Sequence, residues 1–481
     1  MKKSNKPKNT SNNFINLNRQ TKIVATLGPV TTEVQVLKDL LNAGLSVGRI
    51  NMSHGNHVEH TKRIKNFRTA CSELGFNGGV LIDLSGPKIR TGELSTPTVN
   101  LIPGQKLILT TDTIVGDQDK MSVNYPLLAK ELKVGGIVML DDGRRKLVVE
   151  KIEGDEVTCR ILIGGEIKSR RGVNLPGAYL SISAVTDKDI EDVKFALKMK
   201  AEYIALSFVR TADDVKFLKT LLPAKNRPLI ISKIETEEAL KEIDGILAES
   251  DGIMIARGDL AIEVPRTDVP VIQKTLIRKA RIAKKLVITA TQMLETMIKN
   301  PVPTRAEVSD IANAIFDGSD AVMLSEESAM GMFARESVGM MAEVSLSTDP
   351  HLRHRFDEVV LERIEDSLKK QAVVLATELN AKAIIALTET GSTPMKLAAF
   401  KGTRSIIAVT ENEKVAKNLS LVRGVWPKIH KGVTHMSDLR KMIQTIMKEI
   451  GVSKKGECVV VVSGMTFGKS GASNMLFVEY V

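Results

Sequence analysis

Short apolar runs recur along the chain, and each one is followed by a polar break and then by a helical pattern of hydrophobic residues. Eight of these runs are rich in Val, Ile and Leu and cover residues 22–26, 47–51, 79–83, 203–207, 229–233, 252–256, 286–290 and 321–324. Continuous apolar runs of this length are typical of parallel strands that are covered on both faces. Eight such strands alternating with helices predict a (β/α)₈ barrel, the TIM barrel.

One interval in this pattern is too long for a single crossover, because 119 residues separate Asp83 from Tyr203. Within it, residues 93–176 contain short apolar segments separated by glycine turns, and "EGDE" and "IGGE" are typical of hairpins. We therefore expect a small all-β domain, a β-barrel, inserted after the third barrel strand. The large barrel is then assigned to residues 21–92 and 177–345.

The pattern restarts beyond residue 345. A long helical segment, 356–379, leads to three further apolar runs, "AIIALT", "SIIAVT" and "CVVVVSG", with helical stretches between them. Alternating strands and helices of this kind predict a separate C-terminal α/β domain over residues 346–481.

The composition is that of an ordinary globular protein, with 43% hydrophobic and 26% charged residues. The three cysteines, Cys71, Cys159 and Cys458, are far apart and form no CxxC motif. This spacing argues against a disulfide framework or a structural zinc site and fits a reducing compartment. No stretch approaches the roughly 18–20 apolar residues of a membrane span. We expect a cytoplasmic protein that does not bind membranes.

The formal net charge of +11 at first suggests a nucleic-acid partner. Five of these charges lie in residues 1–20, which contain no acidic residue, so that the rest of the chain carries only about +6. A mild bias of this size suits small anionic substrates better than a duplex. The first 20 residues lack the apolar core of a secretory signal and are predicted to be a disordered basic tail.

Charged and polar side chains stand at the carboxyl ends of five predicted strands. They are Arg49 and Asn51 on the second strand, Asp83 and then Arg90 on the third, Lys233 and Glu235 on the fifth, Arg257, Gly258 and Asp259 on the sixth, and Thr291 after the seventh. A single charged strand end is more often solvated than catalytic. In a barrel, however, these ends share the rim that carries the active site, which favours a catalytic cluster.

The residue types in this cluster indicate the chemistry. Arg49, Arg90 and Lys233 supply three positive charges, which suit a phosphate or carboxylate substrate. Glu235 and Asp259 are carboxylates without a neighbouring His or Cys, a set that suits Mg²⁺ or Mn²⁺ rather than zinc. The combination is typical of metal-assisted phosphoryl transfer. The sequence contains no GxxxxGK[ST] motif, so a P-loop is excluded.

Several long segments around these residues closely resemble the pyruvate kinase family. They are "TKIVATLGP", "GRINMSHG", "SGPKIRTG", "RRGVNLPG", "IISKIE", "SDGIMIARGDLAIEVP", "TATQMLETM" and "NPVPTRAEVSDIANAIFDGSDAVML". The resemblance runs from about residue 21 to the C-terminus. It implies a barrel with an inserted β domain and a C-terminal α/β domain, and transfer of the phosphoryl group of phosphoenolpyruvate to ADP.

The resemblance also implies roles for the substrate-side residues. Glu235 and Asp259 would hold Mg²⁺, Lys233 would neutralise the transferring phosphoryl group and the enolate, and Arg49 and Arg90 would grip the phosphoryl group. The Ala256–Asp259 backbone, helped by a helix start at Gly258, would position the substrate carboxylate. Thr291 would act in the proton relay to the enolate. Alternatively, Thr291 simply caps a helix that begins at Gln292.

The nucleotide site implied by the resemblance comprises Thr26, Pro29, Asn51, His54, Arg90 and Arg171. Arg171, where the family usually has Lys, would close with the inserted domain as a lid that excludes water. His54 on its own is also consistent with an ordinary surface or core histidine.

One segment departs from the family in an informative way. Family members that need K⁺ usually read Asp-Thr-Lys-Gly-Pro-Glu after the third strand, whereas this chain reads "DLSGPK". The implied monovalent-cation site, formed by Asn51, Ser53, Asp83 and the residue at position 84, here Leu84, is otherwise retained. Lys88 replaces the glutamate, and its ammonium would supply the charge that K⁺ supplies elsewhere. We therefore predict activity without K⁺; the alternative is that Lys88 is solvated and irrelevant.

The turn "TETGSTP" in the C-terminal domain corresponds to a family loop that binds a phosphorylated effector. Thr388, Thr390, Ser392 and Thr393 would hold the phosphate. An ordinary βα turn is the alternative, and Glu389 would repel an anion.

Two functions of a different class are weaker alternatives. A non-catalytic binder of phosphorylated metabolites on the same fold would be expected to have lost Lys233, Glu235, Asp259 or Thr291, and all four are present. A nucleic-acid binder would need a recognisable module, which the sequence lacks. Family resemblance further implies a homotetramer.

Overall fold

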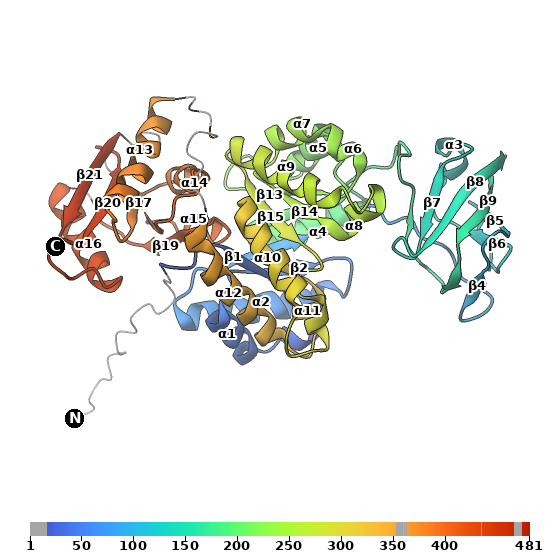
Figure 1. Cartoon of the computed structure of the whole chain (residues 1–481), viewed down its shortest axis with the longest axis horizontal. Helices are drawn as coiled ribbons and strands as arrows, with labels where there is room; N and C mark the ends of the chain where they lie inside the picture. The colour runs from blue at the N-terminus through green and yellow to red at the C-terminus, as the bar shows by residue number, and fades with distance from the viewer. Residues whose placement is uncertain (1–16, 353–358, 360, 362, 434, 466–473) are drawn as a thin grey trace. The chain divides into compact units, whose positions relative to one another are not determined.

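The computed structural model describes residues 17–352, 359, 361, 363–433, 435–465 and 474–481. Its central feature is a closed parallel barrel of eight strands in the order β1-β16-β15-β14-β13-β12-β3-β2 (Figure 1). The strands are β1 Lys22–Thr26, β2 Val47–Asn51, β3 Gly79–Asp83, β12 Tyr203–Leu206, β13 Leu229–Ile234, β14 Gly252–Ala256, β15 Leu286–Ala290 and β16 Ala321–Leu324. All eight predicted strands are therefore confirmed, each to within one residue at either end.

The chain divides into two compact units, and the first contains residues up to Ile82, Met199–Tyr203 and Ile277–Val481. Its barrel helices are α1 Val34–Ala43, α2 His57–Leu74, α10 Arg305–Asp317, α11 Glu326–Ala329 and α12 Ala334–Thr348. Their ends follow local capping rules. Asn56 caps α2 by accepting hydrogen bonds from the backbone N–H groups of Val58 and Glu59, and Gly318 ends α10 in a left-handed conformation.

The second unit contains Asp83–Lys198 and Ile204–Leu276. Its helices are α3 Leu128–Glu131, α4 Asp187–Lys198, α5 Ala212–Thr220, α6 Glu237–Lys241, α7 Ile243–Glu249, α8 Arg257–Glu263 and the first part of α9 Val269–Ile282. Apart from α3, which lies in the inserted domain, these helices occupy the intervals between barrel strands, as the hydrophobic pattern predicts.

The segment inserted after β3 has a hydrophobic core of its own, with Leu107, Leu109, Val138 and Leu147 fully buried. It forms a six-stranded sheet, β11-β7-β8-β9-β5-β6, and a two-stranded sheet, β10-β4. The strands are β4 Val99–Leu101, β5 Lys106–Thr110, β6 Lys120–Ser122, β7 Ile137–Leu140, β8 Arg145–Glu153, β9 Glu156–Ile163, β10 Gly165–Ile167 and β11 Val173–Asn174. Figure 1 shows these strands as one group, in cyan and blue.

Two expectations for this inserted domain are corrected. It is not all β, because α3 lies between β6 and β7. "EGDE" does form a hairpin, between β8 and β9, but "IGGE" does not, because β10 pairs with β4 instead of returning along β9. The glycine pair redirects the chain to a distant strand, a choice that turn chemistry alone does not determine.

The C-terminal part of the first unit is an α/β domain with a five-stranded sheet in the order β19-β18-β17-β20-β21. Its strands are β17 Ile384–Leu387, β18 Ile406–Thr410, β19 Val425–Ile429, β20 Cys458–Ser463 and β21 Met475–Tyr480, and its helices are α13 Ile364–Glu378, α14 Ser392–Ala399, α15 Glu413–Asn418 and α16 Met436–Glu449. The three predicted strands are confirmed, and β19 and β21 are additional. The predicted helix start at residue 356 lies outside the described residues, and α13 begins at Ile364.

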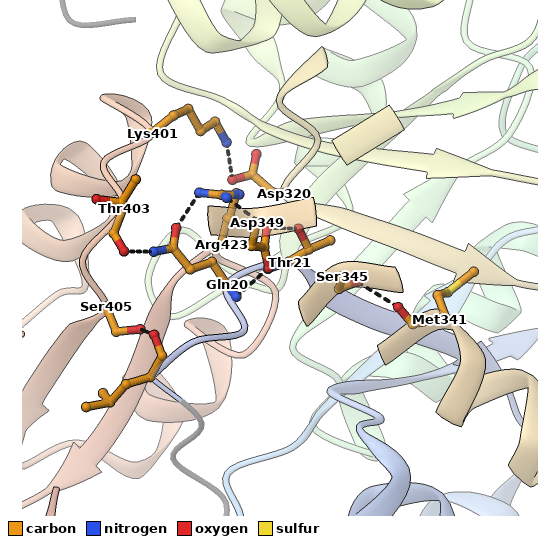
Figure 2. A network of polar contacts seen from close by, with 11 residues as sticks. Gln20, Thr21, Asp320, Met341, Ser345, Asp349, Lys401, Thr403, Ser405 and Arg423 are labelled. Atoms are coloured by element: carbon orange, nitrogen blue, oxygen red, sulfur yellow. Dashed lines mark hydrogen bonds and ion pairs between the residues drawn. The ribbon is translucent and has the colours of Figure 1, made fainter. Parts of the chain in front are cut away.

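The N-terminal segment is not a free tail up to residue 20. Arg19 and Gln20 are buried, so the predicted disorder is wrong for these two residues, while residues 1–16 lie outside the described part. Figure 2 shows how Gln20 joins a polar network: its side chain donates to Thr403 O and accepts from Arg423 Nη1 at 2.6 Å. Ser405 Oγ also donates to Leu17 O, so this segment is bonded to the C-terminal domain.

Two simpler expectations can be compared with the structure. All three cysteines are buried and have free thiols. None of the helices within the described residues is long and apolar enough to cross a membrane.

Candidate active site

Lys233 lies near the carboxyl end of β13 with its ammonium held among three polar groups. Its Nζ is 2.8 Å from Ser207 Oγ, 2.8 Å from Glu235 Oε1 and 3.5 Å from Asp83 Oδ1. The side chain is only 12% exposed, and both carboxylates are buried. The strand period of two directs Lys233 and Glu235 to the same face, as the sequence predicts. The contacts come from three different strand ends, so the cation is fixed by tertiary structure.

Glu235 is a buried carboxylate with incomplete compensation. Its Oε2 accepts a hydrogen bond from Phe208 N at 2.7 Å. Its Oε1 forms the ion pair with Lys233, but in the described part of the chain it accepts no hydrogen bond of good geometry. Burial raises the pKa of Glu235 to about 7; Lys233 opposes this shift and Asp259 adds to it. A buried carboxylate in this condition is suited to an additional cation.

Asp259 lies in the first turn of α8, directly after β14, and is partly buried. The helix begins at Arg257 with Ala256 at its N-cap, one residue before the predicted start at Gly258. The negative charge of Asp259 helps to raise the pKa of Glu235, so the two predicted magnesium ligands lie close enough to interact electrostatically.

No cluster of three or more His, Cys, Asp or Glu side chains with metal-binding geometry occurs among the described residues. Glu235 and Asp259 are therefore a two-carboxylate set. Mg²⁺ is commonly held in this way, by one or two carboxylates plus substrate oxygens and water. The incomplete compensation of Glu235 and the hard oxygen donors fit a divalent cation at this position.

Ser207 and Phe208, which follow β12, are site residues that the sequence prediction missed. Ser207 Oγ donates to Leu84 O at 2.7 Å and accepts from Lys233. Phe208 has a left-handed backbone, φ 52°, which aims its N–H at Glu235. Such backbone strain in a bulky residue is concentrated at functional sites. A polar residue at a strand end was the available signal for Ser207, whereas none existed for Phe208.

The segment after β3 carries Lys88 and Arg90. Lys88 is exposed, yet partial desolvation lowers its pKa, helped by Arg90 and Lys233 and opposed by Asp259 and Asp83. The structure therefore brings Lys88 into the electrostatic surroundings of the site. Arg90 is exposed as well, and its backbone N–H donates to Asn124 Oδ1 at 2.7 Å.

In the first unit, Arg49 is buried on β2 and donates from Nη1 to Thr26 Oγ1 at 2.7 Å. Thr26 in turn donates to Leu324 O, so it orients the guanidinium. Asn51 Oδ1 accepts from Ser53 N at 3.1 Å, which links two of the predicted monovalent-cation ligands.

The remaining predicted residues of the first unit include His54 and Pro29, both exposed. Thr291 does not cap a helix at Gln292, because no helix begins there. Instead, Thr291 and Gln292 both have left-handed backbones, φ 68° and 54°, and Thr291 Oγ1 donates to Ala290 O. The capping interpretation is therefore wrong, and the strained turn favours a functional one.

Arg171 belongs to the inserted domain and remains partly exposed, with 42% of its side chain accessible. Its Nε is 3.7 Å from Asp141 Oδ1, and its backbone N–H donates to Thr91 Oγ1. The weak ion pair leaves the guanidinium able to meet an anion.

The turn over residues 388–394 lies at the carboxyl end of β17. Thr388 Oγ1 accepts from Gly391 N at 2.9 Å, Thr388 and Thr393 are buried, and Thr390 and Ser392 are exposed. The strand order changes direction here, since β17 lies between β18 and β20, and ligands of open α/β sheets bind at such points.

The comparisons with known proteins agree with this architecture. The family model described as "Pyruvate kinase, barrel domain" matches residues 18–338, and "Pyruvate kinase, alpha/beta domain" matches residues 366–479. A pyruvate kinase of Geobacillus stearothermophilus is 40% identical over 97% of this chain and 81% of its own length. One from Staphylococcus haemolyticus is 40% identical over 96% and 80%.

Solved structures give the same result. The crystal structure of a pyruvate kinase from Cryptosporidium parvum has a TM-score of 0.91 and 35% identity, and the match covers 98% of this chain and 99% of that one. With both family models matched and the identity extending over nearly the whole length, the chain belongs to the pyruvate kinase family.

Proposed function

We propose that the chain transfers the phosphoryl group of phosphoenolpyruvate to ADP at the Lys233–Glu235–Asp259 site, with a divalent cation and without a requirement for K⁺. The phosphorus–oxygen bond of phosphoenolpyruvate breaks, a new bond forms to the terminal phosphate oxygen of ADP, and the resulting enolate takes up a proton at carbon to give pyruvate. The ammonium of Lys233, held beside Glu235 and Asp83, is the single observation that most supports this proposal.

Glu235 and Asp259 would hold Mg²⁺, or Mn²⁺. A divalent cation held there would supply positive charge that neutralises negative charge developing on the substrate. Within the described residues, Glu235 Oε1 contacts the Lys233 ammonium but accepts no hydrogen bond of good geometry, which supports this assignment.

The protein cations would complete the phosphoryl site. Lys233 stabilises charge on the transferring group and on the enolate oxygen, and its fixed position means that little reorganisation is needed. Arg49, oriented by Thr26, and Arg90 bind phosphoryl oxygens. The strained Thr291 turn would present a hydroxyl to the water that protonates the enolate.

Binding of the remaining substrate atoms is assigned by the family resemblance. The backbone of Ala256, Gly258 and Asp259 would bind the substrate carboxylate. The nucleotide would be bound by Thr26, Pro29, Asn51, His54, Arg90 and Arg171. Exposure of Arg171 in the inserted domain supports its role as a lid residue.

Independence from K⁺ is supported by the position of Lys88 among the charges of the site. Desolvation, Arg90 and Lys233 lower its pKa, and Asp259 and Asp83 oppose this shift by favouring the ammonium form. The reaction would then need no K⁺ at the implied monovalent-cation site, which is formed by Asn51, Ser53, Asp83 and Leu84.

The test is turnover of phosphoenolpyruvate and ADP with Mg²⁺, coupled to pyruvate detection, in buffers free of K⁺ and Na⁺. We expect full activity there. Absence of pyruvate both in these buffers and after addition of K⁺ would overturn the central proposal. Lys88→Glu should create a dependence on K⁺ of about tenfold or more in kcat/KM, whereas Lys133→Glu, the same charge change at an exposed site in the inserted domain, should create none. A strong K⁺ requirement of the unaltered protein would contradict the Lys88 assignment alone.

A phosphorylated effector at the 388–394 turn is a further part of the proposal. Ser463 Oγ, at the carboxyl end of β20 next to this turn, is fully buried and has no hydrogen-bond partner within the described residues. Binding of a sugar phosphate should lower the concentration of phosphoenolpyruvate needed for half-maximal rate, and Ser392→Glu should abolish this response. An unchanged response in that variant would exclude the turn as the site.

The remaining family properties are proposals as well. We infer a homotetramer in the cytoplasm, where the free thiols of the three cysteines would persist. Light scattering of the purified protein tests the tetramer, and a monomer at micromolar concentration would contradict it.

A further inference from the structure

Asp189, the third residue of α4, is fully buried and uses both carboxylate oxygens. Oδ2 accepts from Thr186 N at 2.9 Å and from Thr186 Oγ1 at 2.6 Å. Oδ1 accepts from Ser85 N at 3.0 Å and from Gly86 N at 3.2 Å. One carboxylate therefore binds two segments that are about a hundred residues apart in the sequence.

The Oδ2 contacts have an ordinary structural purpose. They form one side of a capping box, in which the third helical residue bonds back to the N-cap. Asp214, at the same position of α5, makes the equivalent contacts, because its Oδ2 accepts from Arg210 N at 2.9 Å and Thr211 N at 3.1 Å. Asp214 is only partly buried, and these bonds stay at the start of its own helix. Helix capping thus explains the hydrogen bonds to Asp189 Oδ2 but not those to Oδ1.

The Oδ1 contacts hold the Ser85–Gly86 turn, which directly follows Asp83 and Leu84. Gly86 has φ 63°, and a Cβ atom there would lie 2.8 Å from Phe208 Cδ2 and 2.9 Å from Ser207 Cβ. The turn is therefore pressed against the two residues that contact Lys233 and Glu235. Any displacement of this turn would be transmitted to the site.

The same turn leads into the two cations of the segment, Lys88 and Arg90. Lys188 adds a second tie between the two segments, since its Nζ lies 3.3 Å from Ser85 Oγ. The chain enters the inserted domain after this turn and returns from it just before α4. The hydrogen bonds of Asp189 therefore link the two chain segments that connect the barrel to the inserted domain.

We propose that Asp189 is a positioning residue for phosphoryl transfer. Its Oδ1 fixes the Ser85–Gly86 turn so that Lys88 and Arg90 stand correctly for the phosphoryl group, an inference that rests on the function proposed for these two cations. A buried carboxylate that accepts two backbone N–H groups is a rigid anchor, and errors of about 1 Å in the placement of binding groups can cost about a hundredfold in rate.

The test compares three variants of the full-length protein by kinetics and thermal unfolding. Asp189→Ala should lower kcat/KM for phosphoenolpyruvate by about 10- to 100-fold, mostly through a higher KM, while KM for ADP changes less. Asp214→Ala and Thr186→Val remove capping contacts but leave Oδ1 in place. They should lower Tm by a few degrees, as Asp189→Ala does, and keep kcat/KM within about threefold.

Equal kinetic losses in Asp189→Ala, Asp214→Ala and Thr186→Val would overturn the proposal, because Asp189 would then be a capping residue only. If Asp189→Ala does not fold, Asp189→Asn is compared with the same controls, with a smaller loss expected in the same direction. If kcat/KM of Asp189→Asn equals that of Thr186→Val, the positioning role of Asp189 is likewise contradicted.

A double variant separates this proposal from the function on which it rests. In a Lys88→Met background, removal of Asp189 should cost less than in the unaltered protein, because part of its effect passes through Lys88. If Lys88→Met is itself silent while Asp189→Ala is impaired, the role of Lys88 fails and Asp189 acts through Arg90. If Lys88→Met is impaired and Asp189→Ala is not, the role of Lys88 stands and the positioning role of Asp189 fails.

Discussion

Glu235 and Asp349 are equally buried carboxylates whose surroundings differ sharply. Asp349 accepts four hydrogen bonds, from Gln20 N at 2.6 Å, Thr21 N at 2.8 Å, Thr21 Oγ1 at 2.7 Å and Arg423 Nη2 at 2.8 Å (Figure 2). Among the described residues, Glu235 Oε2 accepts a hydrogen bond from Phe208 N, and Oε1 contacts the ammonium of Lys233 at 2.8 Å. Asp349 thus has a full set of hydrogen-bond donors around its carboxylate, which we call its shell, whereas the shell of Glu235 is incomplete.

This difference separates a structural charge from a functional one. Burial of a charge is costly unless hydrogen bonds and counter-charges replace water. Around Asp349 four hydrogen bonds replace water and join the N-terminal segment to Arg423 of the C-terminal domain. At Glu235 burial raises the pKa to about 7, which means that the ionised form still needs a partner. A bound divalent cation would be that partner.

The largest effect is expected from Glu235→Gln. Loss of the carboxylate should reduce kcat/KM by about a thousandfold or more, since charge stabilisation in the transition state would be weakened. The metal-free variant should nevertheless unfold at a higher temperature than the unaltered protein, because an incompletely compensated buried charge is removed.

Glu202→Gln is the matched control for this variant. Glu202 is buried too, but its Oε2 accepts from Val80 N at 2.7 Å and pairs with Arg68. It should lose stability and keep its activity. If Glu235→Gln is destabilised to the same degree as Glu202→Gln, the charge of Glu235 is as well compensated as that of Glu202.

Asp349→Asn should have the largest effect on folding. Arg423 would be left buried without its counter-charge, and the free energy of unfolding should fall by about 3–5 kcal/mol. Urea unfolding measures this loss, and kcat measured on the folded protein should stay within about threefold. A catalytic loss as large as that of Glu235→Gln would show that the network serves the reaction rather than the fold.

Much of this contrast was beyond the reach of the sequence. The eight barrel strands were predictable because each is a continuous apolar run, and Lys233, Glu235 and Asp259 because they follow such runs. Asp349 and Asp189 carry no such signal, since their partners, Arg423 and Ser85, are about 70 to 100 residues away in the sequence. The burial of Gln20 was missed for the same reason. A polar segment at the start of the chain is predicted to be disordered, because its distant partners cannot be identified from the sequence.

Asp366 is a third buried carboxylate, and its contribution to stability should depend on pH. Its carboxylate oxygens lie 2.8 Å from Lys284 Nζ and 3.3 Å from Lys396 Nζ. Burial alone would raise its pKa, but the two lysines outweigh this effect and lower the pKa to about 2. A lowered pKa in the folded state stabilises the protein above the unfolded value of 3.8, and the gain of about 2 kcal/mol is lost as the pH falls toward 2.

Measurement of unfolding free energies between pH 3 and pH 7 tests the role of Asp366. The difference between the unaltered protein and Asp366→Asn should be constant above about pH 5 and roughly half as large near pH 3. A difference that does not narrow over this range would show that Asp366 acts by packing rather than by charge.

The smallest effect is expected from Gln20→Ala, which tests whether the N-terminal segment belongs to the completed shell. The variant removes the acceptor of Arg423 Nη1 and the donor to Thr403 O while leaving the backbone bond from Gln20 N to Asp349 intact. Loss of one buried hydrogen bond to a charged group should lower the free energy of unfolding by about 1–2 kcal/mol. Gln35→Ala is the matched control, because Gln35 bonds to Asp39 on the exposed face of α1 and should change stability by no more than about 0.5 kcal/mol. Equal effects in urea unfolding would mean that Gln20 lies beside the network without contributing to it, and the shell of Asp349 would then end at Thr21 and Arg423.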